Sequence, residues 1–220
     1  MVDFEKQFER PDYAPWHREE AGVRVATTFK IVYGWMCAGL ALSGAVAWYT
    51  ATSGLYKTIL HGPGFMACVI AELVLVIVLS MAIGKMHVAL AYLMFIGYAA
   101  LNGLTLSVVF IAYELALVQR VFFITAGMFG GLALWGLIIG SLVTLFMHSS
   151  GLDWLLTFAG IVVFTGLTMY DAQKIKQLAM AEGSLDSASL HKAGIMGALA
   201  LYLDFINLFL YILRFFGRKR

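Results

Sequence analysis

Long apolar segments dominate this chain, and each is about as long as a membrane is thick. A transmembrane helix needs about 20 mostly apolar residues, and the longest charge-free segment here, 121–147, has 27. Six segments are predicted to span the membrane: 27–49, 64–83, 88–113, 121–147, 154–170 and 193–216. The chain is 61% hydrophobic and 13% charged, whereas a soluble domain is about half apolar and a quarter charged. The sequence therefore predicts an all-α integral membrane protein, folded as a polytopic helical bundle.

The charged residues predict how the segments are oriented. Residues 1–26 are polar and are predicted to form a cytosolic tail before a single transmembrane domain, 27–220. Six spans place both termini inside, with ten of the 15 lysines and arginines on the inner side, as the positive-inside rule requires. The lysines of "DAQKIKQL" (171–178) are the exception. The polar stretch 173–192 is predicted to be a loop, and a net charge of +2 indicates no nucleic-acid partner.

Asp204 lies near the middle of the last apolar segment. An ionised Asp at that depth costs roughly 2.5–3.5 kcal/mol, so it should face the protein interior. At helical spacing it shares a face with Gly197, Ala200, Asn207 and Tyr211. Two interpretations remain open: a protonated Asp that joins helices by a hydrogen bond, or a carboxylate with an ion- or proton-linked role.

Two more carboxylates lie at or within apolar segments. Asp171 follows the fifth segment and could pair with Lys174 one turn later, while Glu72 lies inside the second segment. Two carboxylates within hydrogen-bonding distance share a proton and titrate with a raised apparent pKa. Once ionised, they offer the oxygen ligands that calcium prefers. Asn102 and Thr105 add polar groups to the third segment, where packing is the expected role.

Several motifs resemble the transmembrane Bax inhibitor motif family, in its bacterial branch. They are "KIVYGWMCAGLALSG", "ALNGLTLS", "GLTMYDAQKIK" and "DSASLHKAGIMGALALYLDFINLFLYILRFFG". The resemblance implies a bundle around a central C-terminal helix, a place in the bacterial inner membrane, and a pH-sensitive calcium leak. It also implies that Asp171 and Asp204 form the pH sensor and gate and bind the cation. Glu72 matches an acidic position of the family and, with Asn207, is assigned to the ion pathway.

The chain departs from the family pattern in two places. Family members usually have seven spans, but here "GGLALWG" runs directly into "LIIGSLVTLF", as if about twenty residues near Gly136 were missing. With seven spans, the lysines of 171–178 would lie inside. A basic residue found in some members would fall on Ile83, and only Lys85 is near.

Two other functions compete with the leak. A non-transporting regulator would act on a membrane protease or a cell-death partner through its lateral surface. An intramembrane aspartyl protease is disfavoured, because "MYDA" resembles one half of such a site, whereas Asp204 follows "LYL" and lacks the Gly-x-Gly-Asp of the other half. The sequence therefore predicts no enzyme and no cofactor, with the lipid bilayer and calcium as partners and calcium as the transported or bound ion.

Overall fold

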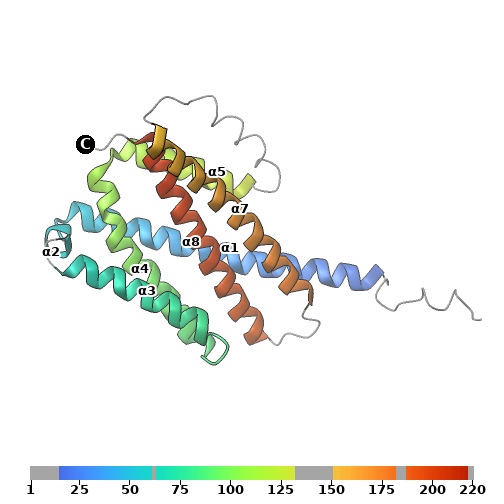
Figure 1. Ribbon diagram of the computed structural model, residues 1–220. Helices are drawn as coiled ribbons and strands as arrows, with labels where there is room; N and C mark the ends of the chain where they lie inside the picture. Colours follow the sequence, from blue (N-terminus) through green and yellow to red (C-terminus); the bar gives the residue numbers. More distant parts are fainter. Residues whose placement is uncertain (1–14, 61–62, 132–150, 182–186, 218–220) are drawn as a thin grey trace, which may run out of the picture.

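The computed structural model describes residues 15–60, 63–131, 151–181 and 187–217, and within these ranges it contains helices and no strand (Figure 1). The helices are α1 (Pro15–Thr52), α2 (Tyr56–Leu60), α3 (Gly64–Ala82), α4 (Val88–Ala112), α5 (Leu115–Gly131), α7 (Gly151–Ala181) and α8 (Ser187–Phe216). The predicted all-α fold class is confirmed.

Four of these helices are long and apolar enough to cross a bilayer: Gly22–Thr52 within α1, α3, α4, and Ala188–Phe216 within α8. The apolar part of α5, Leu115–Phe129, is shorter. The chain is thus a polytopic membrane protein, as predicted. Residues 132–147 of the predicted fourth span lie outside the described residues, so the number of six spans stays a prediction.

Three predicted boundaries differ from the structure. The predicted loop 173–192 is wrong for 173–181 and 187–192, because α7 continues to Ala181 and α8 begins at Ser187; residues 182–186 lie outside the described residues. The stretch after Asp171 is polar but rich in Ala, Gln, Lys, Leu and Met, which favour a helix whether or not lipid surrounds it. Helix α5 begins at Leu115, six residues before the predicted span. Helix α1 begins at Pro15, within the predicted tail, and proline is well suited to a first helical turn.

Helix α8 lies at the centre of the bundle. It packs against α1, α4, α5 and α7, and Figure 1 shows it running between α7 on one side and α4 on the other. In its most apolar part 61% of the residues are buried, compared with 6% for α3 at the edge. The expected central C-terminal helix is confirmed.

Small residues let α1 and α4 approach closely. A Cβ atom on Gly103 of α4 would lie 2.7 Å from the carbonyl oxygen of Ser43 and 2.7 Å from Cβ of Val46, both on α1. Close approach through small residues is typical of helix pairs in membranes, where packing replaces the hydrophobic effect between helices. Gly103 therefore sets the distance between these two helices.

Gly103→Ala is expected to lower the free energy of unfolding by about 1–3 kcal/mol, because the new methyl group forces two backbones apart. The matched control is Gly97→Ala on the same helix, where a Cβ would meet no atom of the described part of the chain within 4 Å. Thermal unfolding of both variants in detergent measures the difference. Equal stability of the two variants would show that α1 and α4 do not pack at Gly103.

Candidate ion-pathway site

The contact between α7 and α8 carries two of the predicted site residues. Gly197 of α8 packs against Ile175 of α7, and further along, Tyr211 of α8 packs against Gly160 of α7. These contacts show that the helices run antiparallel, with one face of α8 turned to α7. Asp204 lies between Gly197 and Tyr211 on that face, as the spacing in the sequence predicted.

The carboxyl group of Asp204 is buried, with 6% of the residue exposed. The Thr168 side chain of α7 lies next to it, with its hydroxyl donating to the Phe164 carbonyl over 2.8 Å, and the Asp171 carboxyl is close enough to act on it electrostatically. Its Oδ2 atom has no hydrogen-bond partner among the described residues. Buried polar atoms almost always have a partner, so this oxygen is suited to hold a proton or a cation.

Asp171 is only partly buried and lies within electrostatic range of Lys174 on the same helix. Both predicted neighbours of Asp171 are thus present, Asp204 across the interface and Lys174 one turn along α7. Asn207 lies one turn from Asp204 on α8 and is partly buried. The structure places these residues on one side of α8, and their roles in sensing and conduction stay predictions.

Glu72 lies apart from this pair, on α3, which packs against α4. The hydroxyl of Thr105 donates to Glu72 Oε1 over 2.8 Å, and the side chain of Asn102 is a second hydrogen-bonding neighbour. Both partners come from α4, in the "ALNGLTLS" motif. Asn102 and Thr105 therefore hydrogen-bond the Glu72 carboxylate, whereas the sequence predicted only a packing role for them.

A chain of buried hydrogen bonds continues from Asn102 into the core. The Tyr202 hydroxyl donates to Asn102 Oδ1 over 3.0 Å, and the Ser43 hydroxyl lies 2.6 Å from the Tyr202 oxygen. The single hydrogen of the Ser43 hydroxyl can go to Tyr202 or to the backbone oxygens of Ala99 and Gly39, which lie 2.7 Å and 2.9 Å away. We call Glu72, Asn102, Tyr202 and Ser43 the relay; it joins α3, α4, α8 and α1.

Tyr202 and Ser43 could not be identified as site residues from the sequence, since both lie in apolar stretches and are fully buried. The one indication of Tyr202 in the sequence is that it lies two residues before Asp204. The relay and the Asp171–Asp204 pair reach α8 from different neighbours, α4 with α1 in one case and α7 in the other. The four predicted residues are thus split between two polar regions that meet at α8.

Within the part of the chain that the structure describes, no group of three or more His, Cys, Asp or Glu side chains is placed to hold a metal ion. Asp171 and Asp204 offer two carboxylates, which suits a weakly held, exchanging calcium ion better than a resident one, because tight calcium sites use six to eight oxygen ligands.

The profile of the family described as "Inhibitor of apoptosis-promoting Bax1" matches residues 25–137 and 131–220. The protein is a member of the Bax1 inhibitor family. Among its relatives, the inner membrane protein YbhL of Escherichia coli K12 is 42% identical over 211 residues, which cover 86% of this chain and 90% of YbhL. Uncharacterized proteins of Deinococcus radiodurans and Borreliella burgdorferi are 39% and 37% identical, with the same coverage. No solved structure matches this chain.

The comparisons test whether a segment near Gly136 is missing relative to the family. The two family matches meet at 131–137, where the sequence suggested a missing segment. The alignment with YbhL is 211 positions long, yet 86% of 220 residues is about 189, so about 20 positions have no counterpart in this chain. This Bax1 inhibitor family member is an integral protein of the bacterial inner membrane.

Proposed function

We propose that this Bax1 inhibitor family member is a pH-sensitive calcium leak, in which Asp171 and Asp204 sense protons and gate the cation. The observation that carries the proposal is the buried Asp204 Oδ2, which has no hydrogen-bond partner among the described residues and lies within electrostatic range of Asp171. A carboxyl in such a place holds either a proton or a cation. The same two carboxyls can therefore exchange one for the other.

The gate follows from the charge of the pair. In acid the two carboxyls share a proton, which removes their repulsion and holds α7 against α8. As the pH rises the proton leaves, and the two like charges repel each other across the interface. The closed arrangement binds the extra proton, so it is favoured at low pH and disfavoured as the pH rises. Calcium competes with the proton for the same oxygens.

Calcium flux into liposomes tests this function. The purified chain is reconstituted in vesicles that contain a calcium-sensitive dye, and uptake is followed between about pH 5 and pH 8. We expect flux to rise with pH, and Asp204→Asn to flatten the profile. Glu114→Gln, at the exposed turn between α4 and α5, is the control and should keep the wild-type profile. Flux equal to that of empty vesicles at every pH would favour the non-transporting regulator instead.

Glu72→Gln is expected to reduce calcium flux several-fold while leaving the amount of folded protein near the wild-type level. The amide oxygen of Gln still accepts from Thr105, so the contact with α4 survives while the charge is lost. Flux per folded molecule, from the same vesicle assay, measures the effect. Thr105→Val is the matched control, because it removes the hydrogen bond and keeps the charge. A Glu72→Gln variant that accumulates poorly but conducts normally would make Glu72 a structural residue.

A further inference from the structure

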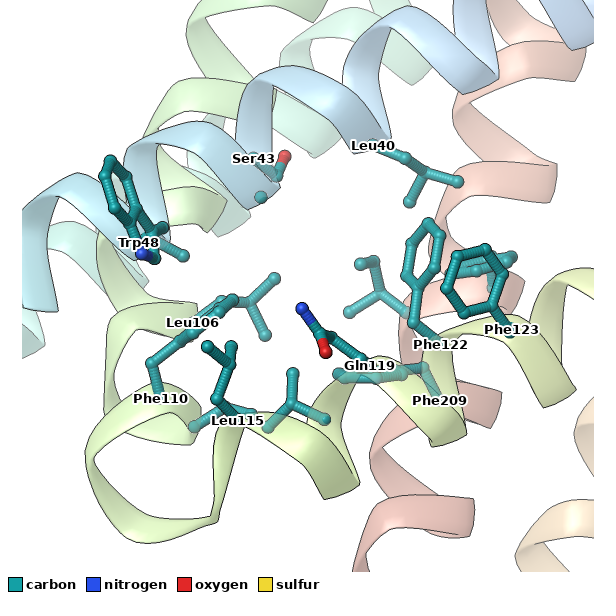
Figure 2. Close-up of a pocket in the computed structure, with 16 residues that line it drawn as sticks. Leu40, Ser43, Trp48, Leu106, Phe110, Leu115, Gln119, Phe122, Phe123 and Phe209 are labelled. Carbon is teal, nitrogen blue, oxygen red and sulfur yellow. The ribbon is translucent and has the colours of Figure 1, made fainter.

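A cavity of about 390 Å³ lies between α1, α4, α5 and α8, and no residue of α7 lines it (Figure 2). Its walls are almost entirely apolar: Leu40, Ala47, Trp48, Leu106, Val109, Phe110, Leu115, Val118, Phe122, Phe123, Phe205, Ile206 and Phe209. Its volume is within the range of small-molecule sites. Neither carboxylate of the Asp pair lines it, so the proposed leak does not explain it.

Two polar side chains line this space: Ser43, whose hydroxyl belongs to the relay, and Gln119. Figure 2 shows its carboxamide directed into the cavity from α5. It makes no hydrogen bond to any residue that the structure describes. Gln119 is exposed on α5, and an amide that lies beside apolar walls is stabilised by a hydrogen bond to a group that enters the same space. The cavity therefore favours an occupant that is mostly apolar and carries one hydrogen-bond acceptor.

The position of Gln119 along α5 indicates the depth of this acceptor in the membrane. Gln119 lies in the second turn of a helix that starts at Leu115, directly after the turn that ends α4. Four residues at 1.5 Å per residue place it only about 6 Å from that helix end. Trp48, in the last turns of α1, lies on the cavity wall, and tryptophan is enriched where hydrocarbon meets headgroups. The acceptor thus lies at the level of the ester carbonyls of a phospholipid.

Arg120 carries a positive charge close to the depth of the ester carbonyls. Arg120 follows Gln119 directly and is exposed on α5, and long arginine side chains extend toward the membrane surface. A guanidinium there complements a phosphate group, to which it can donate two hydrogen bonds. Apolar walls, an amide at the ester level and an arginine beside it match the three parts of an anionic phospholipid.

We propose that the cavity binds one acyl chain of an anionic phospholipid. The Gln119 amide donates to an ester carbonyl of the lipid, and Arg120 contacts its phosphate. The acyl chain lies against Phe122, Phe209 and the other apolar walls, between α5 and α1.

Native mass spectrometry of the full chain in mild detergent, titrated with dioleoyl phosphatidylglycerol, tests the proposal. Gly44 lies on the cavity wall, and a Cβ there meets no atom of the described residues within 4 Å. Gly44→Leu should therefore fill the cavity without a clash and weaken lipid binding at least tenfold. Gly34→Leu is the matched control on the same helix: its site is also open and does not line the cavity, so binding should stay at the wild-type level.

Gln119→Leu keeps the fold and the apolar walls but removes the hydrogen bond, and should weaken binding about threefold to tenfold. Arg120→Gln should reduce the preference for phosphatidylglycerol over phosphatidylcholine. Circular dichroism confirms that each variant is folded. Equal lipid binding by wild type and folded Gly44→Leu would overturn the proposal. So would the absence of any lipid adduct on the wild type, as expected if residues 132–150 or a second copy of the chain filled the cavity.

Discussion

Asp171→Asn is expected to remove most of the pH dependence of calcium flux, and adding Asp204→Asn should change the profile little further. The Asp171 carboxyl acts on Asp204 electrostatically across the α7–α8 contact, and the proposed gate requires the two to share one proton as a unit. Removing either carboxyl abolishes the shared proton and the repulsion together. Coupled groups of this kind are not additive, whereas independent sites are.

The vesicle flux assay on the wild type, both single variants and the double variant provides the four measurements of a double-mutant cycle. Lys174→Gln is a useful control, because it removes the other charge near Asp171 and keeps the pair. If the main role of Asp171 is to pair with Lys174, Asp171→Asn and Lys174→Gln should behave alike, and both should retain the wild-type pH profile of calcium flux. Fully additive effects of the two aspartate variants would show that the carboxyls titrate separately, and Asp204 would then be an interhelical hydrogen-bonding group.

Tyr202→Ala is expected to have the largest effect on stability, lowering the free energy of unfolding by about 3–5 kcal/mol. Tyr202 is fully buried in the central helix. Its ring packs edge-on against Phe95 and Tyr98 of α4, with centroids 6.0 Å and 5.7 Å away. The substitution leaves a cavity there and also removes the hydroxyl that joins Asn102 to Ser43.

Tyr202→Phe separates the two contributions, because it keeps the ring and removes only the hydroxyl. Leaving Asn102 without its donor should cost about 1–2 kcal/mol. Leu210→Ala, on the exposed side of the same helix, is the control and should cost less than either variant. Thermal unfolding in detergent measures all three. A Tyr202→Phe variant as unstable as Tyr202→Ala would assign the whole effect to the relay, and an unchanged Tyr202→Ala would contradict the central place of α8.

The carboxylates in the membrane were the part of the site that sequence could predict. A charged residue in a membrane-spanning segment is energetically costly, so Asp204 and Glu72 can be identified as candidate site residues from the sequence alone. The face that Asp204 presents to α7 also followed from helical spacing. The partners of Glu72 could not be predicted, since they depend on which helix lies beside α3. Ser43 and Tyr202 lie 159 residues apart in sequence, and no local pattern links them.

Helix ends were the weakest part of the prediction for a related reason. Apolar length indicates where lipid surrounds the chain, but a helix can continue into water if its residues favour one. Helix α7 therefore passes Asp171 and reaches Ala181. The apolar cavity lined by Gln119 could not be predicted from the sequence either, because it is formed by the packing of four helices from both ends of the chain.

The separation of α7 and α8 as a function of pH tests the central claim most directly. Spin labels at Val163→Cys and Leu210→Cys, both exposed positions on these helices, report the distance by pulsed electron resonance, with Cys37 and Cys68 replaced by Ala. We expect the distance to increase as the pH rises from about 5 to 8 in the protein with both aspartates, and to stay constant in Asp204→Asn. A distance that does not change with pH, or that changes equally in Asp204→Asn, would contradict a gate held closed by a proton shared between Asp171 and Asp204.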